Sequence, residues 1–345
     1  MRICLVGDFS SPDEARKVMG HHLLRELSKN NEVKPLNIQA TLSTNFWNEI
    51  NSFDPEIIHY IPGASPLSFL ITKLMKIHSK NAKTVMFSSL HAFHSFSHGF
   101  YYGFSSISKN FIPFFKTDLV LVQSDEPEKI FTKLGCNVKF FVSSGVDIKK
   151  FHPASRKSKE ELREKYKISS EKFVVLHVGS VRKWRNVSIL KEIQNNQDVQ
   201  VVLVGRTSTK FEVDVALELK RIGVEIINEY IPKIEEIYAL SDCYIFPTTD
   251  PIGSIDIPLS ILEAMATNLP IVSTRFGGLP RIFNEGEGFT YADTKKFAQE
   301  VKELNDGEIS VKTRELVLHY SWENISKKLD KIYYDLRNST DKSDE

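Results

Sequence analysis

The sequence lacks the features that assign a chain to several common classes of protein. Its three cysteines, Cys4, Cys136 and Cys243, lie in separate apolar surroundings without paired or metal-ligand spacing, so no disulfide framework or zinc site is indicated. No apolar run approaches the roughly 20 residues of a membrane span, and Met1 leads directly into the strand-like RICLVG without a signal-peptide pattern. The 45 basic and 44 acidic residues nearly cancel, which argues against a nucleic-acid partner. These absences predict a cytoplasmic protein with reduced cysteines.

Common nucleotide-binding motifs are also missing. There is no Walker-type glycine loop, and no G-x-G-x-x-G follows the first strand-like segment, so ATP hydrolysis and dinucleotide binding lose support. The chain also has no D-x-D pair, a common device for holding a metal on a nucleotide diphosphate. A bound diphosphate would therefore need positive side chains and helix dipoles in place of a metal.

What the sequence does contain is a regular alternation of strand-like and helical segments, in two series. The first series has the strands RICLVGD, PEIIHYI, TVMFSSLH, DLVLVQS and KFFVSS, and the second has FVVLHVGS, VQVVLVG, GVEIIN, DCYIFPT and PIVST. Short, wholly apolar strands separated by helices are typical of a parallel sheet covered on both faces. We therefore predict an α/β protein with two doubly wound, Rossmann-like domains that face each other across a cleft, where ligands bind beyond the carboxyl ends of the strands.

The domain boundaries follow from a charged stretch over residues 147–172 that separates the two series. We assign residues 1–150 to an N-terminal Rossmann-like domain and residues 151–320 to a C-terminal Rossmann-like domain. A helix over residues 321–336 is expected to pack back across the domain junction, and residues 337–345 form a polar tail. Within the charged stretch, Ser158 and Glu161 have the spacing of a capping box at the start of a short helix.

One charged residue interrupts an otherwise apolar helix. In IDIPLSILEAMATNLP, Pro258 suits the first turn and Asn268 the end of a helix over residues 259–267, within which Glu263 is the only charged side chain. A helix that is apolar on nearly every side is typical of a protein interior. An unsatisfied carboxylate there would cost several kcal/mol, so Glu263 needs a partner. A salt bridge to an arginine and a ligand site are both open interpretations.

A cationic loop follows the first strand of the second series. The segment GSVRKWRN places Arg182, Lys183 and Arg185 at the end of a strand, where a parallel sheet binds its ligands. Charge runs usually face water, but these side chains could also hold a diphosphate, with arginine as a forked donor and lysine as a point charge. The N-terminal amides and dipole of the 259–267 helix would attract the same anion. Together with Glu263 as an acceptor for ribose hydroxyls, they predict a nucleotide site.

Four segments in order along the chain resemble motifs of glycosyltransferase family 4, the retaining group 1 sugar transferases of the GT-B fold. SSGVDIKKFHP resembles the family's N-G-V-D-x-x-x-F-x-P linker, and DCYIFPTTD resembles its A-D-V-F-V-x-P-S strand. LEAMATNLPIVSTRFGGLPRIFNEGEGF is similar to its L-E-A-M-A-x-G-x-P-V-V-A block, and HYSWENISKKLDKIYYDL is similar to its closing F-S-W helix. The resemblance covers almost the whole chain.

This resemblance implies roles for individual residues. Glu263 matches the second acid of the family's E-x7-E motif, which binds ribose hydroxyls, and Arg185 stands where G-R-x-x-x-x-K-G has its phosphate-binding lysine. His91, in FSSLHAFH, stands at a strand end where related enzymes place a histidine against the donor sugar, although a lone histidine is more often structural. The implied set has no metal ligand; it comprises His91 as catalytic residue and Gly179, Arg182, Arg185, Asp256, Ile257, Leu259, Ser260 and Glu263 as donor-binding residues.

The pattern fails where the sugar should lie. Ile255 replaces the first acid of E-x7-E and cannot hydrogen-bond a hydroxyl, although Asp250 and Asp256 are near in sequence. Pro258 replaces a glycine and removes a backbone donor, and Ser180 replaces the arginine of G-R, an exchange that Arg182 could offset. Nucleotide recognition is thus better supported than sugar recognition.

The resemblance implies a hexosyltransferase-type enzyme (EC 2.4) without a cofactor or metal. It would move a sugar from a nucleotide diphosphate sugar, UDP- or GDP-linked, to a hydroxyl of a glycan, a lipid-linked or a small-molecule acceptor. Because of Ile255, a non-catalytic nucleotide-sugar binding or partner subunit remains an alternative, as does a sugar-nucleotide epimerase, against which the linker and the L-E-A-M-A block argue. The aromatic-rich residues 93–115 could form helix core, an acceptor groove, or a peripheral contact at the inner face of the membrane.

Overall fold

The computed structural model of the 345-residue chain describes residues 1–10, 15–88, 112–205 and 211–339. It divides into two compact units: unit 1 comprises Met1–Ser144 and Trp322–Glu345, and unit 2 comprises Gly145–Ser321. His91 and residues 93–111 lie outside the described residues. None of the helices within the described ranges combines the length and apolar character needed to cross a bilayer.

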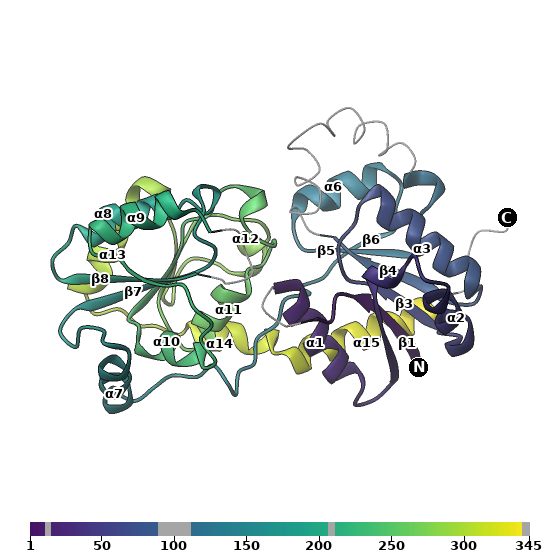
Figure 1. Cartoon of the computed structure of the whole chain (residues 1–345), viewed down its shortest axis with the longest axis horizontal. Coiled ribbons are helices and arrows are strands. Elements are labelled where there is room, and N and C mark those ends of the chain that lie inside the picture. The colour runs from purple at the N-terminus through teal and green to yellow at the C-terminus, as the bar shows by residue number, and fades with distance from the viewer. Residues whose placement is uncertain (11–14, 89–111, 206–210, 340–345) are drawn as a thin grey trace. The chain divides into compact units, whose positions relative to one another are not determined.

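In the described part of unit 1, six parallel strands form one sheet in the order β2-β1-β3-β4-β5-β6 (Figure 1). The strands are β1 (Arg2–Gly7), β2 (Glu32–Asn37), β3 (Ile57–Tyr60), β4 (Lys83–Phe87), β5 (Leu119–Val122) and β6 (Val138–Phe140). The inner strands β1, β3, β4 and β5 are almost entirely buried, as expected for a sheet covered on both faces. The predicted parallel sheet is confirmed.

The helices of unit 1 cover both faces of this sheet. They are α1 (Ala15–Leu27), α2 (Thr44–Phe53), α3 (Pro66–His78), α6 (Asp125–Lys133) and α15 (Trp322–Asn338), with the 3-10 turns η1 (Ile38–Ala40) and η2 (Ile112–Phe114). In Figure 1, α2, α3 and α6 lie on one face, and α1 and α15 lie on the other.

The C-terminal helix α15 is an integral part of unit 1. The Tyr333 hydroxyl hydrogen-bonds Nδ1 of His59 on β3, and both side chains are fully buried. Asp330 accepts a hydrogen bond of 2.9 Å from Asn31, and the ring of Trp322 stacks on His22 of α1 at a centroid distance of 4.7 Å. The last helix of the chain therefore closes one face of the first sheet.

In the described part of unit 2, six further parallel strands form a sheet in the order β12-β11-β10-β7-β8-β9. The strands are β7 (Phe173–Val178), β8 (Val199–Val204), β9 (Glu225–Ile227), β10 (Cys243–Phe246), β11 (Ile271–Ser273) and β12 (Phe289–Tyr291). The two doubly wound sheets are those of a GT-B fold.

The helices of unit 2 also form two layers. They are α7 (Arg156–Tyr166), α8 (Leu190–Gln194), α9 (Val213–Arg221), α10 (Ile234–Leu240), α11 (Leu259–Ala266), α12 (Leu279–Ile282), α13 (Phe297–Asp306) and α14 (Thr313–Val317). The 3-10 turns are η3 (Lys183–Arg185), η4 (Val187–Ile189), η5 (Pro251–Gly253), η6 (Thr294–Lys296) and η7 (Leu318–Tyr320). Figure 1 shows α8, α9 and α13 on one face of the sheet and α10, α11 and α14 on the other.

Several local predictions have clear outcomes. The helix around Glu263 is confirmed, with Thr267 as its C-cap and Asn268 in the left-handed region at φ 61°. All three cysteines are free and buried. The predicted capping box is wrong, because helix α7 begins one turn earlier: Ser155 is its N-cap and accepts a 3.1 Å hydrogen bond from the N–H of Ser158.

Candidate functional site

After each of the two middle strands of the unit 2 sheet, β7 and β10, the chain continues toward a different edge of the sheet. From β7 the chain continues through α8 to β8 on one side, whereas β10 pairs with the other side of β7 and continues through α11 to β11. At such a switch in strand order, the connections diverge beyond the carboxyl ends of the strands, and ligands bind there. The residues that follow Val178 and Phe246 therefore form the candidate site.

Gly179 allows Arg185 to fold back over the end of β7. A Cβ atom at Gly179 would lie only 3.2 Å from Nη1 of Arg185. The turn that carries Arg185 ends at Asn186, which has a left-handed φ of 56° and whose side chain donates a 3.2 Å hydrogen bond to the carbonyl of Pro247. The guanidinium of Arg185 lies 5.8 Å from the ring centroid of Phe246. It is thus held at the carboxyl ends of both β7 and β10.

The other cations of this loop are Arg182, which is partly buried like Arg185, and Lys183. Arg182 precedes η3 in an extended conformation, and its guanidinium lies 5.5 Å from the ring centroid of Trp184, which is 40% exposed. The side chain of Lys183 is exposed, and its backbone N–H donates to Glu212 over 3.1 Å. The loop therefore offers one partly buried guanidinium at the strand ends and a second at its rim.

His177, the penultimate residue of β7, lies close to Gly179, as Arg185 does. Its Nδ1 lies 2.9 Å from the carbonyl oxygen of Ile245, so Nδ1 carries the proton and Nε2 keeps a lone pair. Burial, assisted by the charge of Arg185, lowers the pKa of His177 from 6.5 to about 4. Among the described residues, no group hydrogen-bonds to Nε2, which would lie 3.1 Å from a Cβ atom at Gly179. The strand end thus combines a neutral buried acceptor with a cation.

The turn after β11 fixes the start of α11. The N–H of Gly278 donates to the carbonyl of Asp256 over 3.0 Å, and a Cβ atom at Gly277 would lie 2.3 Å from that oxygen. The side chains of Asp256, Ile257 and Leu259 are buried. These three predicted donor-binding residues are therefore enclosed by the protein in this structure.

Ser260 and Glu263, on the first two turns of α11, bond to tyrosines from neighbouring elements. The hydroxyl of Tyr244 on β10 lies 2.7 Å from Oγ of Ser260, and the hydroxyl of Tyr238 on α10 donates to Oε2 of Glu263 over 2.7 Å. Burial raises the pKa of Tyr244 to about 12, which keeps this hydroxyl protonated. Glu263 itself is half-buried. Its carboxylate thus has a protein donor on one oxygen, and it retains capacity to accept further hydrogen bonds.

Three aromatic rings connect the two halves of the site. The rings of Tyr238 and Tyr244 lie 6.0 Å apart, and those of Tyr244 and His177 lie 6.4 Å apart. The row runs from Tyr238, which hydrogen-bonds Glu263 on α11, to His177, which lies beside Arg185 at the end of β7. Four predicted residues, Gly179, Arg185, Ser260 and Glu263, are brought together around it.

The carboxylates considered for the missing first acid have other surroundings. Oδ1 of Asp250 accepts a 2.9 Å hydrogen bond from the N–H of Ile252 and so caps η5. Asp256 is fully buried, and Ile255 is partly buried. Asp250 is thus engaged in a turn, and Asp256 is enclosed by the protein. His91 lies outside the described residues.

The sequence interpretation missed the residues beneath the site. His177, Tyr238, Tyr244 and Phe246 were interpreted as parts of apolar strands and helices. Only His177 left a signal, because a histidine in the buried strand FVVLHVGS must be either satisfied or functional. Tyr244 gave none, since strands are commonly rich in aromatic residues, and Tyr238 gave none because it stands among other apolar residues of helix α10.

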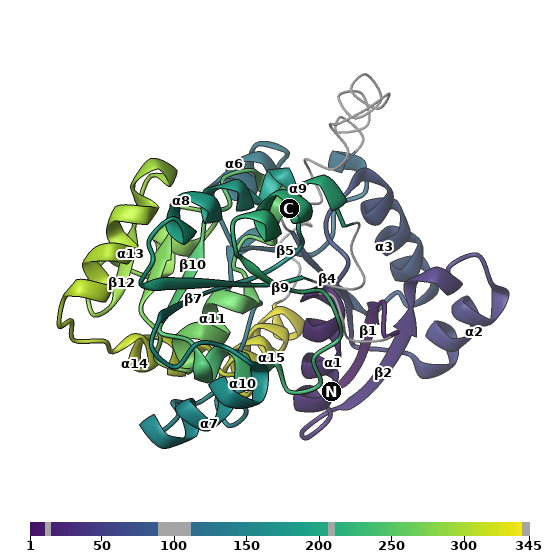
Figure 2. The ribbon, with the colours of Figure 1, turned by 60° about the vertical axis from the view of Figure 1, so that its left-hand side comes forward.

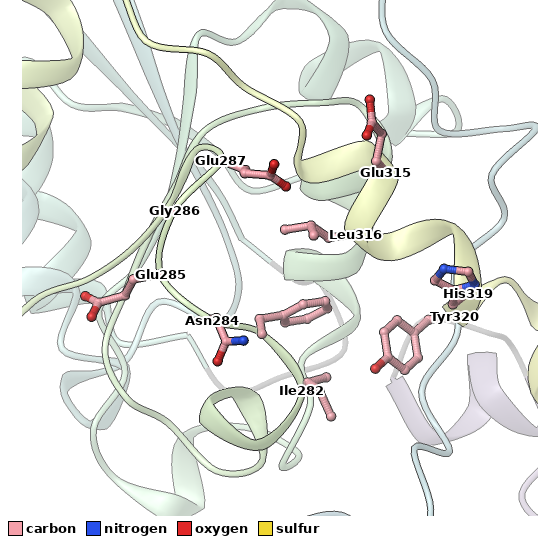
Figure 3. Close-up of a pocket in the computed structure, with 10 residues that line it drawn as sticks. Ile282, Asn284, Glu285, Gly286, Glu287, Glu315, Leu316, His319 and Tyr320 are labelled. Atoms are coloured by element: carbon pink, nitrogen blue, oxygen red, sulfur yellow. The ribbon is translucent and has the colours of Figure 1, made fainter.

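Unit 2 also contains a hollow of about 660 Å³ that involves none of the predicted residues. It lies between residues 282–287 and the α14–η7 segment, and Figure 3 shows Leu316 and Tyr320 projecting toward residues 282–287. Glu285 at its edge pairs with Arg275 at 3.0 Å. Within the described ranges, no three His, Cys, Asp or Glu side chains are grouped so that they could hold a metal ion.

Comparison with known proteins identifies relatives of the second sheet. Residues 172–306, which include β7 to β12, match the model of the family described as glycosyl transferases group 1. The chain is 27% identical to spore coat protein SA of Bacillus subtilis over 225 residues, covering 56% of this chain and 57% of that protein. It is 26% identical to the D-inositol 3-phosphate glycosyltransferase of Corynebacterium urealyticum over 218 residues, covering 56% of this chain and 50% of that protein. The chain thus spans about half the length of the curated relatives it matches.

Similarity to solved structures extends over nearly the whole chain. The crystal structure of Anabaena HepE in complex with UDP has a TM-score of 0.75 and 15% sequence identity, and the match covers 97% of this chain and 100% of that one. At this identity the likeness establishes the two-domain fold.

Proposed function

We propose that the protein transfers a sugar from a nucleotide diphosphate sugar to an acceptor hydroxyl, because residues 172–306 match the model of the family described as glycosyl transferases group 1. A curated relative is named a D-inositol 3-phosphate glycosyltransferase, and a solved structure of the same fold is a complex with UDP. Both support a nucleotide-linked donor. We further propose that the configuration of the anomeric carbon is retained and that the donor is UDP- or GDP-linked.

The observation that carries this proposal is the arrangement at the switch point of the unit 2 sheet. Arg185 after β7 and Glu263 on α11 are joined by the row of rings from His177 to Tyr238. A cation, a helix N-terminus and a half-buried carboxylate match the phosphates and the ribose of a nucleotide in both charge and hydrogen bonding. We assign the ribose hydroxyls to Glu263 and the diphosphate to Arg182, Arg185 and the first amides of α11.

Catalysis in this proposal comes from positioning and from stabilising the departing diphosphate. The negative charge that develops on the leaving group would meet two guanidinium groups and the helix dipole, without a protein-bound metal. Gly179 gives the phosphates access to the strand end, and Ser260 and the main chain of residues 256–259 line the donor site. No protein nucleophile is proposed. His91 is assigned to the donor sugar on the strength of the sequence resemblance alone.

The acceptor is the least defined part of the proposal. We propose a glycan or a lipid-linked acceptor bound by unit 1, with residues 93–115 as a candidate contact. Of that segment, only Ile112–Phe114 and Phe115 belong to the described residues, and Phe114 is 73% exposed.

A two-stage measurement tests the proposed function. Thermal unfolding of the full chain is recorded with UDP, GDP and ADP, because a ligand that binds only the folded state raises the melting temperature. The sugar conjugates of the stabilising nucleotide are then incubated with a lipid and glycan extract, and release of free nucleotide is followed. We expect one base to stabilise unit 2 and its sugar conjugate to be turned over. Stabilisation by none of the three nucleotides would contradict the assignment of the site.

One observation favours a second candidate function, a nucleotide-sugar binding subunit without catalytic activity. Ile255 occupies the position of the first acid, and Asp250 is engaged as the cap of η5. A donor that binds with measurable affinity but is not consumed with any acceptor fraction would support this second function over the first.

A further inference from the structure

Helix α3 of unit 1 exposes a stripe of large apolar side chains to solvent. Leu67, Leu70, Leu74 and Ile77 are 61%, 38%, 39% and 58% exposed. Their spacing places them on one side of a helix, because residues three, four and seven positions apart share a face. In Figures 1 and 2, α3 lies along the outside of unit 1 beside α2. We call this stripe the outer face of α3.

The opposite side of α3 is fully used by the fold. Phe69 and Met75 are completely buried in the core cluster of unit 1, and the hydroxyls of the buried Ser68 and Thr72 donate hydrogen bonds to main-chain carbonyls. Ser65 caps the helix by accepting from the N–H of Ser68 over 3.1 Å. The apolar residues of the outer face are therefore not needed to hold the helix in place, so their presence requires a separate explanation.

Helix α3 itself carries basic residues and no acidic one, although the neighbouring helix α2 contains Glu49 and ends at Asp54. The chain has 44 acidic residues, yet none lies between Glu56 and Asp118, whereas six lysines do. Lys73 and Lys80 are exposed on and just after α3, and Lys76 pairs with Asp118 at 2.5 Å. A leucine-rich helix face with lysines at its border, and without acids, is complementary to a surface that is apolar inside and anionic outside.

Helix α9 of unit 2 provides the contrast. It also exposes two apolar side chains one turn apart, Val213 at 57% and Leu217 at 50%. The same helix carries Asp214 and Glu218 as well as Lys220 and Arg221, so α9 has charges of both signs, whereas α3 has only basic ones. Exposure alone therefore does not distinguish α3; its combination with only basic charges on the same helix does.

We propose that the outer face of α3 docks on an anionic lipid surface. The four apolar side chains enter the boundary between head groups and acyl chains, and Lys73 and Lys80 remain at the level of the phosphates, with their stems along the apolar face. This inference concerns unit 1 and does not depend on the nucleotide site, so it can be tested without donor or acceptor.

The test is co-sedimentation of the full chain with vesicles of phosphatidylcholine alone and of phosphatidylcholine with phosphatidylglycerol. The unmodified protein is expected to bind the anionic vesicles at least about tenfold more tightly, and added salt should weaken this binding. A double variant Leu67→Ser, Ile77→Ser should lower the partition coefficient about tenfold, because each exposed residue gives up apolar contact with the lipid. A second variant, Lys73→Glu with Lys80→Glu, should lower it at least about tenfold on anionic vesicles only.

Matched control variants distinguish docking through the outer face of α3 from nonspecific binding to vesicles. Val213→Ser with Leu217→Ser removes two side chains of similar exposure from α9, and Lys295→Glu with Lys296→Glu makes the same charge change on an exposed turn of unit 2. Neither should alter vesicle binding. Because all replaced side chains are exposed, melting temperatures should stay close to that of the unmodified protein. Equal binding to both vesicle types, or equal losses in the α9 variant, would overturn the proposal.

A second copy of this chain is the competing occupant of the outer face. Sedimentation velocity of the unmodified protein and of the Leu67→Ser, Ile77→Ser variant decides between the two. If the unmodified protein is a dimer, the variant a monomer, and neither binds vesicles, the outer face is an interface between copies and the lipid assignment is wrong.

Discussion

Glu263 has a hydrogen-bond partner within the protein and a proposed role in binding ribose, and its geometry allows the two roles to be tested separately. One carboxylate oxygen accepts from the buried hydroxyl of Tyr238, a contact within the protein, while the side chain as a whole is only half-buried. If the carboxylate of Glu263 were purely structural, replacing it together with Tyr238 would leave the affinity for a nucleotide unchanged. Replacing a ribose-binding carboxylate would lower that affinity.

The first prediction follows from this difference. Glu263→Ala should weaken UDP or GDP binding, whichever the protein binds, by roughly 1.5 to 3 kcal/mol, the scale of hydrogen bonds to a charged group. Tyr238→Phe removes the internal donor and leaves the carboxylate, so affinity should change little. Calorimetric titration with the nucleotide and its 2′- and 3′-deoxy forms provides the measurement. The unmodified protein should discriminate against the deoxy forms and the Glu263→Ala variant should not; equal discrimination by both would remove the ribose assignment.

The second prediction concerns Arg185 and its neighbour Lys183. Arg185→Ala should weaken binding of the nucleoside diphosphate about tenfold or more and leave the weaker binding of the bare nucleoside unchanged, because only the former offers phosphate oxygens to the guanidinium. Lys183→Ala, a change of the same charge in the same loop, is the control and should have a smaller effect, since that side chain is exposed. Equal losses for diphosphate and nucleoside in the Arg185 variant would argue against a phosphate role.

At the scale of elements, the start of α11 depends on the turn after β11. Gly277 has φ 54° and its Cα hydrogen approaches the carbonyl of Asp256, where a Cβ atom would lie at 2.3 Å. Any side chain at this position must push the two segments apart. The helix whose amides are proposed to face the diphosphate is thus positioned by a loop that contributes no side chain.

The third prediction tests this coupling. Gly277→Ala should lower the free energy of unfolding by at least about 2 kcal/mol, from steric overlap added to the cost of a positive φ, and should also weaken nucleotide binding. Gly286→Ala is the comparison, because Gly286 also has a positive φ, 116°, but a Cβ atom there would have no described atom within 4 Å. It should lose stability while keeping nucleotide affinity. Chemical denaturation and calorimetric titration of both variants supply the two readouts.

On the scale of the whole molecule, each unit encloses one histidine whose protonation opposes folding. Burial lowers the pKa of His59 in unit 1 from 6.5 to about 3 and that of His177 in unit 2 from 6.5 to about 4. In the unfolded chain both would take up a proton near pH 6.5. The folded state therefore binds fewer protons between these values, and its stability is complete above pH 6.5 and declines as the pH falls.

The fourth prediction is an acid-induced loss of stability in both units. Each histidine should contribute a loss on the order of 3 kcal/mol by about pH 4. His177→Asn should be less stable at neutral pH but should show a shallower decline for unit 2, and His59→Asn should do the same for unit 1. His152→Asn, at an exposed position, should leave the profile unchanged. Denaturant unfolding from pH 7.5 to 4 measures all three, and parallel profiles in every variant would contradict the assignment.

The buried inner strands were predictable from the sequence as apolar runs, and of the four edge strands β6 and β9 were also predicted although they are less buried. β1, β3, β5, β7 and β10 appear as apolar runs because helices cover them on both faces. The edge strands β2 and β12 were not predicted. β2 contains Pro35 and is buried only at Leu36, and β12 is three residues long, so neither forms a continuous apolar run.

Site residues were predictable where their place in the sequence, directly after a strand or alone as a charge in an apolar helix, already marks them. Arg185 directly follows a strand, and Glu263 stands alone as a charge in its helix, so both are visible in the sequence. The structural roles of Asp250 and Asp256 were not predictable from the sequence. A carboxylate in a loop can cap a turn, be buried or face a ligand, and its neighbours in sequence do not distinguish these roles.

The sequence by itself determined that this chain forms two parallel sheets, that a cationic loop follows the first strand of the second sheet, and that one carboxylate lies in an apolar helix. Those properties are local, since they depend on the periodicity of apolar residues and on what immediately follows a strand. Only the tertiary structure decided that Tyr238 from α10 is a partner of Glu263, that His177 is neutral beneath Arg185, and that α15 bonds to β3 through Tyr333 and His59. The physical reason is strand order: β10 returns beside β7, and this pairing brings together side chains whose separation along the chain conceals their proximity.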